Sequence, residues 1–118
     1  MELDEVLEAH QKWVESEGKE GKRADLRNAI LQEADLHDVN LQGADMQNAK
    51  LSVADLMGAN LRLANLKGAD LWMADMKGAF LQGAELQGAN LGDVTNLTQA
   101  QVDSAITDDK TVLPSGLK

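Results

Sequence analysis

Small and large apolar residues alternate with polar ones along most of this chain, in a pattern that repeats every five residues. From residue 24 to residue 93 the sequence divides into fourteen uninterrupted blocks of five. The first position is Ala in thirteen blocks, and the third is Leu in twelve and Met in two. The second position is Asp or Asn in ten blocks. Such regularity indicates a repeat protein.

A period of five suits neither an α-helix nor a straight β-strand. On a helix, residues five apart are rotated by about 140°, so the leucines would define no face. On a straight strand, residues an odd number apart point to opposite sides. The chain must therefore bend once in each block. The Ala and Leu of a block, two residues apart on a short extended segment, then point into a common interior.

The fifth position of each block predicts where the chain turns. Ten of the fourteen residues there are Gly, Asn or Asp. These residues tolerate the positive φ that the third residue of a type II turn requires. The other four are Glu33, Val53, Leu63 and Met73, and for these corners we predict a different turn type.

The tandem pattern A-[DN]-L-x-x resembles that of the pentapeptide-repeat family over 70 of the 118 residues. The resemblance implies an all-β solenoid, a right-handed quadrilateral β-helix with four blocks per coil and therefore about three and a half coils. It also implies that the third-position side chains form the structural core. These are Leu26, Leu31, Leu36, Leu41, Met46, Leu51, Leu56, Leu61, Leu66, Leu71, Met76, Leu81, Leu86 and Leu91.

The segments on either side of the repeats are predicted to be caps, because an open coil leaves apolar side chains and backbone groups uncovered. Residues 3–16 have the spacing of an amphipathic α-helix. Thr98 and Gln101 form a capping-box pattern that predicts a short helix over 98–106, followed by an extended tail over 111–114. We expect one domain, 1–118, made of a capping helix and connector (1–23), the repeats (24–93) and a C-terminal cap (94–118).

Charge and composition argue against several classes of function. The net charge of −9, with only 11 Lys and Arg, opposes binding to nucleic acid or to an anionic membrane. The chain has no Cys, which excludes disulfides and thiolate metal sites. The acidic start and the lack of an 18-residue apolar run favour a cytoplasmic protein.

The candidates for chemistry are few. His10 is expected on the packed face of the first helix, in a hydrogen-bonded structural role. His37 lies between Asp35 and Asp38 and is expected to point outward, without a metal or acid–base role. No nucleophile or phosphate-loop motif is present. We therefore expect a protein that is not an enzyme, with no catalytic residue, cofactor or metal.

On a twenty-residue coil, two acidic ladders are predicted on opposite sides. One contains Asp35, Asp55 and Asp75, and the other contains Asp25, Asp45, Asn65 and Glu85. Short polar side chains at these positions can stabilise turns by hydrogen-bonding the backbone. The alternative is that the ladders imitate the phosphates of DNA.

An outward apolar cluster is also predicted. Val53 and Met73 should stack at one corner, with Trp72 adjacent and Ile30 on the same side. Met57, Leu63 and Phe80 are further outward apolar residues. Three explanations are open: a terminal segment covers the cluster, it is a site for self-association or for another protein, or its members are merely scattered and exposed.

These features favour a non-catalytic structural and protein-interaction module with an unidentified protein partner, which could be a second copy of the chain in a homodimer. The alternative comes from the family resemblance, because some pentapeptide-repeat proteins are gyrase-binding DNA mimics. It would make this chain a DNA-mimicking protein that binds a type II topoisomerase. This chain has fewer coils than those proteins.

Overall fold

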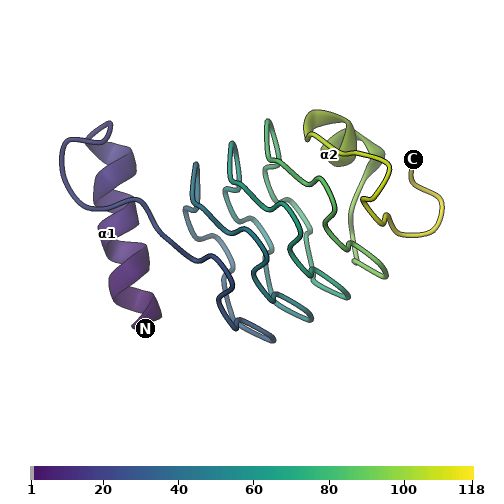
Figure 1. The fold of residues 1–118 in the computed structure, drawn as a ribbon, viewed down its shortest axis with the longest axis horizontal. Helices are drawn as coiled ribbons and strands as arrows, with labels where there is room; N and C mark the ends of the chain where they lie inside the picture. Colours follow the sequence, from purple (N-terminus) through teal and green to yellow (C-terminus); the bar gives the residue numbers. More distant parts are fainter. Residues whose placement is uncertain (1) are drawn as a thin grey trace.

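The repeats form a stack of coils that lies between two helices (Figure 1). The structure, a computed structural model, describes residues 2–118. Helix α1 spans Leu3–Glu15 and helix α2 spans Gln99–Ser104. Between them the β-structure consists of isolated parallel bridges between residues twenty apart, from Asp25↔Asp45 to Asp75↔Thr95. A twenty-residue period with four bridged positions per coil gives the stack four sides, and the molecule measures 41 × 24 × 22 Å.

All fourteen corners have the same geometry. The fifth residue of every block has a positive φ, and the following first-position N–H donates to the third-position carbonyl, as from Ala29 to Leu26 at 3.1 Å. The prediction of a different turn at four corners is wrong, because Glu33, Val53, Leu63 and Met73 have φ of 59–62°. Backbone hydrogen bonds to the adjacent coil constrain each corner. The fifth residue of a block therefore adopts a positive φ even where its residue type disfavours it.

The core is a column of aliphatic side chains along the axis of the coils. All fourteen predicted third-position residues are buried, and none is more than 5% exposed. First-position alanines from Ala44 to Ala89 are buried with them. The coil continues two residues beyond the last full block, because Val94 is buried and Thr95 pairs with Asp75.

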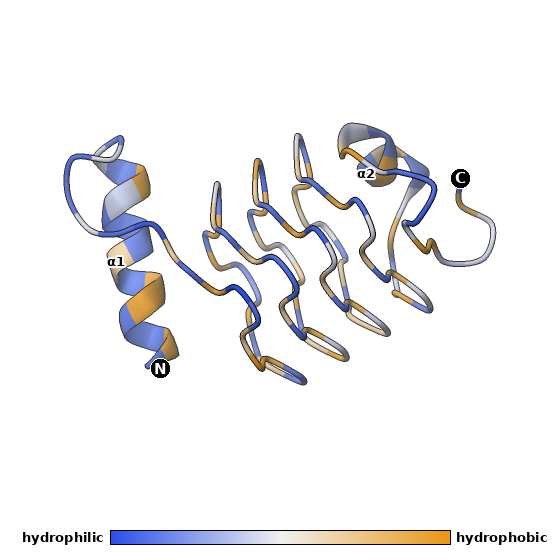
Figure 2. Ribbon diagram, in the orientation of Figure 1, coloured by the Kyte–Doolittle hydropathy of each residue, from blue (hydrophilic) through white to orange (hydrophobic). Residues whose placement is uncertain are grey.

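Helix α1 covers the first coil. Its residues Leu3, Val6 and Leu7 pack partly buried against the core, and in Figure 2 its hydrophobic residues gather on the side toward the coils. The helix ends at Glu15, and the N–H of Gly18 donates to the carbonyl of Trp13 at 2.8 Å.

Helix α2 and the residues after it lie against the last coil. The predicted capping box is present, with Thr98 and Gln101 each bonded to the backbone of the other. The helix is shorter than predicted and ends at Ser104. Beyond it, Ile106 pairs with Glu85 and Val112 pairs with Asn90. The tail thus adds an irregular partial turn to the coil.

Candidate functional site

Three residues of the predicted apolar cluster, Val53, Trp72 and Met73, lie together at one edge of the coil and remain exposed. Their exposed fractions are 44%, 43% and 44%, so neither terminal segment, as far as the structure describes it (2–23 and 94–118), covers them. Val53 and Met73 occupy equivalent corners of adjacent coils, and the N–H of Val53 donates to the carbonyl of Trp72 at 2.8 Å. Val112 of the C-terminal tail, 51% exposed, lies close to Gly92, as Trp72 does. We call these four residues the apolar corner.

The indole of Trp72 is held in place from two directions. Its Nε1 donates to Asp93 Oδ2 at 3.3 Å. A Cβ atom at Gly92 would lie 3.4 Å from Trp72 Cδ1 and 3.9 Å from Val112 Cγ1, so the two side chains flank this glycine. Sequence reasoning missed Val112, because it lies outside the repeat register and only the path of the tail brings it here.

The other outward apolar residues do not join the apolar corner. Ile30 lies on the same side but in the first coil, where it pairs with Lys50. Leu63 is at a corner of another side, close to Gly83. Phe80 lies under the guanidinium of Arg62, with Arg62 Cζ 4.2 Å from the ring centroid.

The acidic ladder of Asp35, Asp55 and Asp75 forms as predicted, through parallel bridges between successive coils. Each carboxylate Oδ1 accepts a hydrogen bond from the backbone N–H two residues later, at 3.3, 3.0 and 3.1 Å. All ten Asp and Asn residues at the second position make this bond, including Asn40 and Asn90. The residue type at this position therefore has a structural reason that is independent of any partner.

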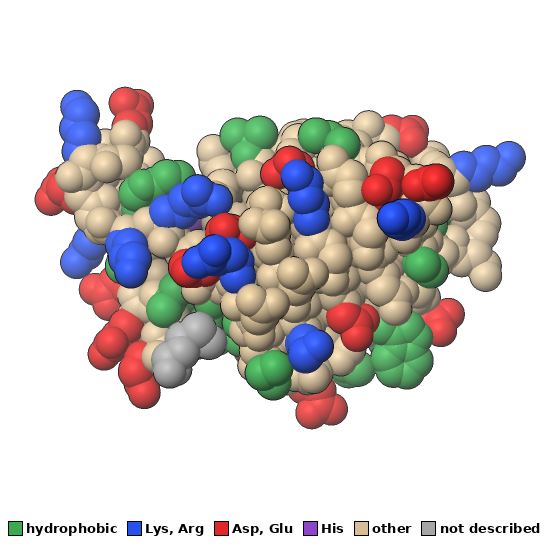
Figure 3. Space-filling model, in the orientation of Figure 1, with side chains coloured by type: hydrophobic (Ala, Val, Ile, Leu, Met, Phe, Trp, Pro, Cys, Tyr) green, Lys and Arg blue, Asp and Glu red, His purple; other side chains and the backbone are tan. Residues whose placement is uncertain are grey.

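The opposite ladder is largely paired with cations. Arg27 Nη2 lies 2.8 Å from Asp25 Oδ2, and Arg27 Nε lies 3.7 Å from Asp45 Oδ2. Hydrogen bonds from Arg27 lower the pKa of Asp25 to about 2. Lys67 pairs with Glu85 at 3.3 Å. On the face in Figure 3, basic and acidic side chains accordingly lie next to one another over the coils.

The two histidines have different environments. His10 is fully buried; its Nε2 lies 2.9 Å from the carbonyl oxygen of Gln42, and its Nδ1 accepts the N–H of Ala24 at 2.9 Å. Burial lowers the pKa of His10. His37 is exposed, and its Nδ1 lies 2.5 Å from Asp35 Oδ1. This hydrogen bond raises the pKa of His37.

The described part of the chain contains no helix of the length and apolar character needed to cross a membrane.

Comparison with known proteins gives a family match over the repeats. A family model described as pentapeptide repeats matches residues 22–56 and 54–93, with 8 copies. No curated protein matches.

Solved structures of similar proteins include alr5209, a pentapeptide repeat protein from Nostoc Pcc 7120. It is 33% identical, with 96% of this chain and 88% of that chain covered and a TM-score of 0.52. The pentapeptide repeat protein Rfr23 from the cyanobacterium Cyanothece 51142 is 35% identical, with 81% and 68% covered and a TM-score of 0.46. QnrB1, a plasmid-mediated fluoroquinolone resistance protein, is 19% identical, with 79% and 68% covered and a TM-score of 0.34. The similarity to QnrB1 is too low to carry a functional argument.

Proposed function

The chain belongs to the pentapeptide-repeat family, and on this basis we propose that it is a non-catalytic protein-interaction module that binds its partner through the apolar corner. Family membership implies a right-handed β-helix, with which the parallel pairing of residues twenty apart agrees. The observation that carries the proposal is the exposure of Val53, Trp72 and Met73, each close to half exposed, at one edge of a rigid coil.

The apolar corner has the character of a binding hot spot. Tryptophan is enriched at the energetic centre of protein interfaces, and Trp72 is already held by Asp93 and by its position beside Gly92. A side chain that is ordered before binding loses less conformational entropy on association. At Val53 and Met73, hydrogen bonds to the adjacent coil fix the main chain from which the side chains project. These features support a surface that is formed before its partner arrives.

The helices have a separate, structural role in the proposal. Helix α1 and the C-terminal segment from α2 onward cap the two ends of the coil. Their support is the packing of Leu3, Val6 and Leu7 at one end and the pairing of Ile106 and Val112 at the other. Capping prevents the ends of the coil from pairing with other chains. In this proposal the partner is therefore bound at the apolar corner and not at the ends of the coil.

The test compares Trp72→Ala with Leu63→Ala, which removes an even more exposed apolar side chain, 62% against 43%, from another corner. Sedimentation velocity over a range of protein concentrations measures self-association, and affinity capture measures other partners. We expect Trp72→Ala to weaken association and Leu63→Ala to leave it unchanged. If the mass distribution and the captured proteins are the same for wild type and Trp72→Ala, the apolar corner is not the binding surface.

The alternative function, DNA mimicry toward a type II topoisomerase, has one supporting observation. The carboxylates of Asp35, Asp55 and Asp75 are stacked in register on one side of the coil. The opposite ladder presents less unpaired negative charge, because Arg27 and Lys67 form ion pairs with its carboxylates. A supercoiling assay with gyrase tests this alternative. If micromolar protein neither inhibits gyrase nor protects it from quinolones, the alternative is rejected. An effect that is lost when Asp35, Asp55 and Asp75 are all replaced by Asn would support it.

A further inference from the structure

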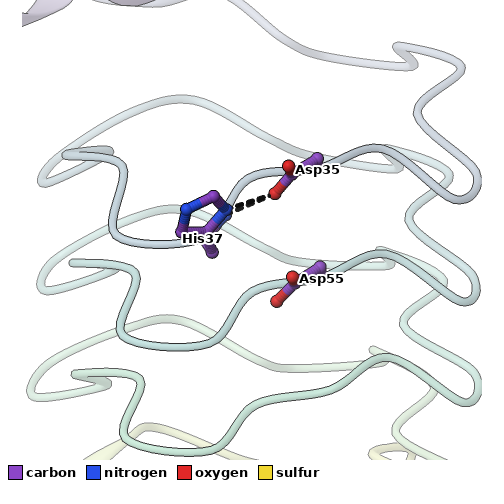
Figure 4. A group of neighbouring side chains, drawn as sticks. All are labelled: Asp35, His37 and Asp55. Carbon is purple, nitrogen blue, oxygen red and sulfur yellow. Dashed lines mark hydrogen bonds and ion pairs between the residues drawn. The ribbon is translucent and has the colours of Figure 1, made fainter.

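One end of the acidic ladder contains an imidazole as well as carboxylates. Asp35 and His37 belong to the first coil, and Asp55 belongs to the second, directly paired with Asp35. One potential ligand atom from each of the three side chains lies within 4.8 Å of the other two. Figure 4 shows the imidazole and both carboxylates on the same side of the coil, with Asp55 stacked on Asp35.

The backbone orients the two carboxylates without using all of their oxygens. Asp35 Oδ1 accepts the N–H of His37 at 3.3 Å, and Asp55 Oδ1 accepts the N–H of Met57 at 3.0 Å. Each carboxylate therefore completes its turn with Oδ1, and a carboxylate oxygen pair has further lone pairs available. The structural role of the aspartates in the turns is compatible with a second role as ligands.

The three side chains border a hollow. It is lined by Asp35, His37, Asp38, Asp55, Met57, Gly58, Lys77 and Gly78. The corners equivalent to Asp38 in the next two coils are glycines, Gly58 and Gly78, so these two corners add no side chain to the hollow. The carboxylate of Asp38 lies against Gly58 at the rim. Three carboxylates against one ammonium leave the hollow negatively charged when His37 is neutral.

We propose that Asp35, His37 and Asp55 bind a divalent transition-metal ion in this hollow, with water completing the coordination. One imidazole and two carboxylates are a ligand set for ions such as Zn²⁺, Co²⁺ and Mn²⁺. Magnesium and calcium prefer sites made of oxygen alone. An ion bound at about 2.0–2.2 Å would replace the hydrogen bond between His37 Nδ1 and Asp35 Oδ1. Asp35 and His37 are exposed and Asp55 is half-buried, so small side-chain rotations can bring the three groups around one ion. The sequence placed His37 beside Asp35, but only the coil brings Asp55 to the same point.

The repeat provides a matched control on the opposite side of the coil. Asp25, Arg27 and Asp45 occupy the positions ten residues before Asp35, His37 and Asp55. There the guanidinium of Arg27 pairs with both aspartates, so this side already holds a cation of its own. Replacing Arg27 with histidine would give it the same three ligand types.

The binding test uses Co²⁺ with the full chain, by isothermal titration calorimetry and by the visible absorption of the bound ion. We expect one Co²⁺ per chain and at least tenfold weaker binding in His37→Ala and in Asp55→Asn. Asn at position 55 can still accept the turn hydrogen bond, so this variant should fold, and circular dichroism verifies it. Asp75→Asn, which removes an aspartate of the same ladder away from the histidine, should bind as wild type does.

The transfer test uses Arg27→His. We expect it to raise the stoichiometry from one to two Co²⁺ per chain. The proposal is overturned if wild type shows no Co²⁺ binding at millimolar concentration. It is also overturned if His37→Ala binds as tightly as wild type, or if Asp75→Asn weakens binding as much as Asp55→Asn. Either of these results would mean that the metal responds only to the general negative charge.

Discussion

Val53 is a single residue whose conformation is decided by the coil around it. It has a φ of 61°, a value that is unfavourable for a β-branched side chain. The left-handed conformation costs about 1–2 kcal/mol for an ordinary residue. The N–H of Val53 and the N–H of Ala54 are both bonded, to Trp72 and Leu51 at 2.8 and 3.0 Å. Any other φ at this corner would break the pairing between coils, so the strain is retained.

Relieving this strain should stabilise the protein. We expect Val53→Asn to raise the free energy of unfolding by roughly 0.5–1 kcal/mol, because Asn adopts positive φ more readily. The reciprocal change is Gly88→Val, at a corner with a φ of 70° where a Cβ would be 3.9 Å from the nearest atom. It should lower the free energy of unfolding by about 1–2 kcal/mol. Urea denaturation measures both, and a stabilising Gly88→Val would contradict the strain argument.

His10 couples the position of α1 to pH. Its neutral form is the one that accepts the N–H of Ala24 at Nδ1, and burial lowers its pKa in the folded protein. In the unfolded chain the same histidine takes up a proton near its ordinary pKa of about 6.5. The unfolded state then binds more protons than the folded state, so acidification favours unfolding.

The free energy of unfolding should therefore be at its full value above about pH 7 and fall as the pH drops through about 6.5. The loss should end once the pH is below the lowered pKa of the folded state. The measurement is urea denaturation at several pH values in a His37→Gln background, which leaves His10 as the only histidine. Adding His10→Gln should remove the pH dependence in this window. A double variant with the same slope would show that another group is responsible.

Among the elements, α2 is too short to be stable by itself, and its contacts with the last coil hold it in place. Helices shorter than about 12–15 residues are marginal in water, and α2 spans six. Gln101 contributes twice. Its Oε1 accepts the N–H of Thr98 at 2.9 Å in the capping box, and its Nε2 donates to the carbonyls of Met76 and Ala79 at 3.0 and 2.9 Å. The same side chain thus caps the helix and satisfies backbone groups of the coil.

This double role predicts an order of effects. Thr98→Ala removes one side of the capping box and should cost about 1 kcal/mol. Gln101→Ala also leaves the two coil carbonyls without their donor and should cost at least about 2 kcal/mol. Thermal denaturation of the two variants measures the difference. Equal effects would mean that water replaces Gln101 at the carbonyls without loss.

For the whole molecule, stability depends on coils that support one another in a line. Each coil contacts only its neighbours, as in other repeat proteins. On each side of the stack, parallel bridges join residues of successive coils. Leu56 lies in the second coil, fully buried, with its N–H bonded to Asp75 and its carbonyl to Ala59. A substitution that disrupts the packing of Leu56 therefore destabilises the coils before and after it.

Leu56→Asp should abolish the cooperative unfolding transition, because it places an unpaired charge on the axis. Met57→Asp is the matched control, since Met57 is the next residue and points outward, 38% exposed. We expect the control to retain its melting transition with little change. Circular dichroism during heating distinguishes the two. A Leu56→Asp protein that melts like wild type would contradict a core built on this axis.

The five-residue period was sufficient to predict the interior of the coil, because it determines which residues point inward and which are neighbours twenty positions apart. It correctly placed all fourteen core side chains and both ladders. It failed at Glu33, Val53, Leu63 and Met73, where we judged each corner from the preference of its own residue. Pairing between coils outweighs a preference of about 1–2 kcal/mol, so all corners are alike.

Features outside the repeat register depended on the folded chain. Val112 comes close to Gly92, which Trp72 also borders, only because the tail pairs with the coil at Asn90. No periodicity in the sequence specifies that path. The meeting of His37 with Asp55 is an intermediate case: the period places the residues in adjacent coils, but their side-chain distance depends on turn hydrogen bonds that orient each carboxylate. A short-range repeat encodes the register of the backbone, whereas contacts between side chains and with the tail depend on how that backbone packs in three dimensions.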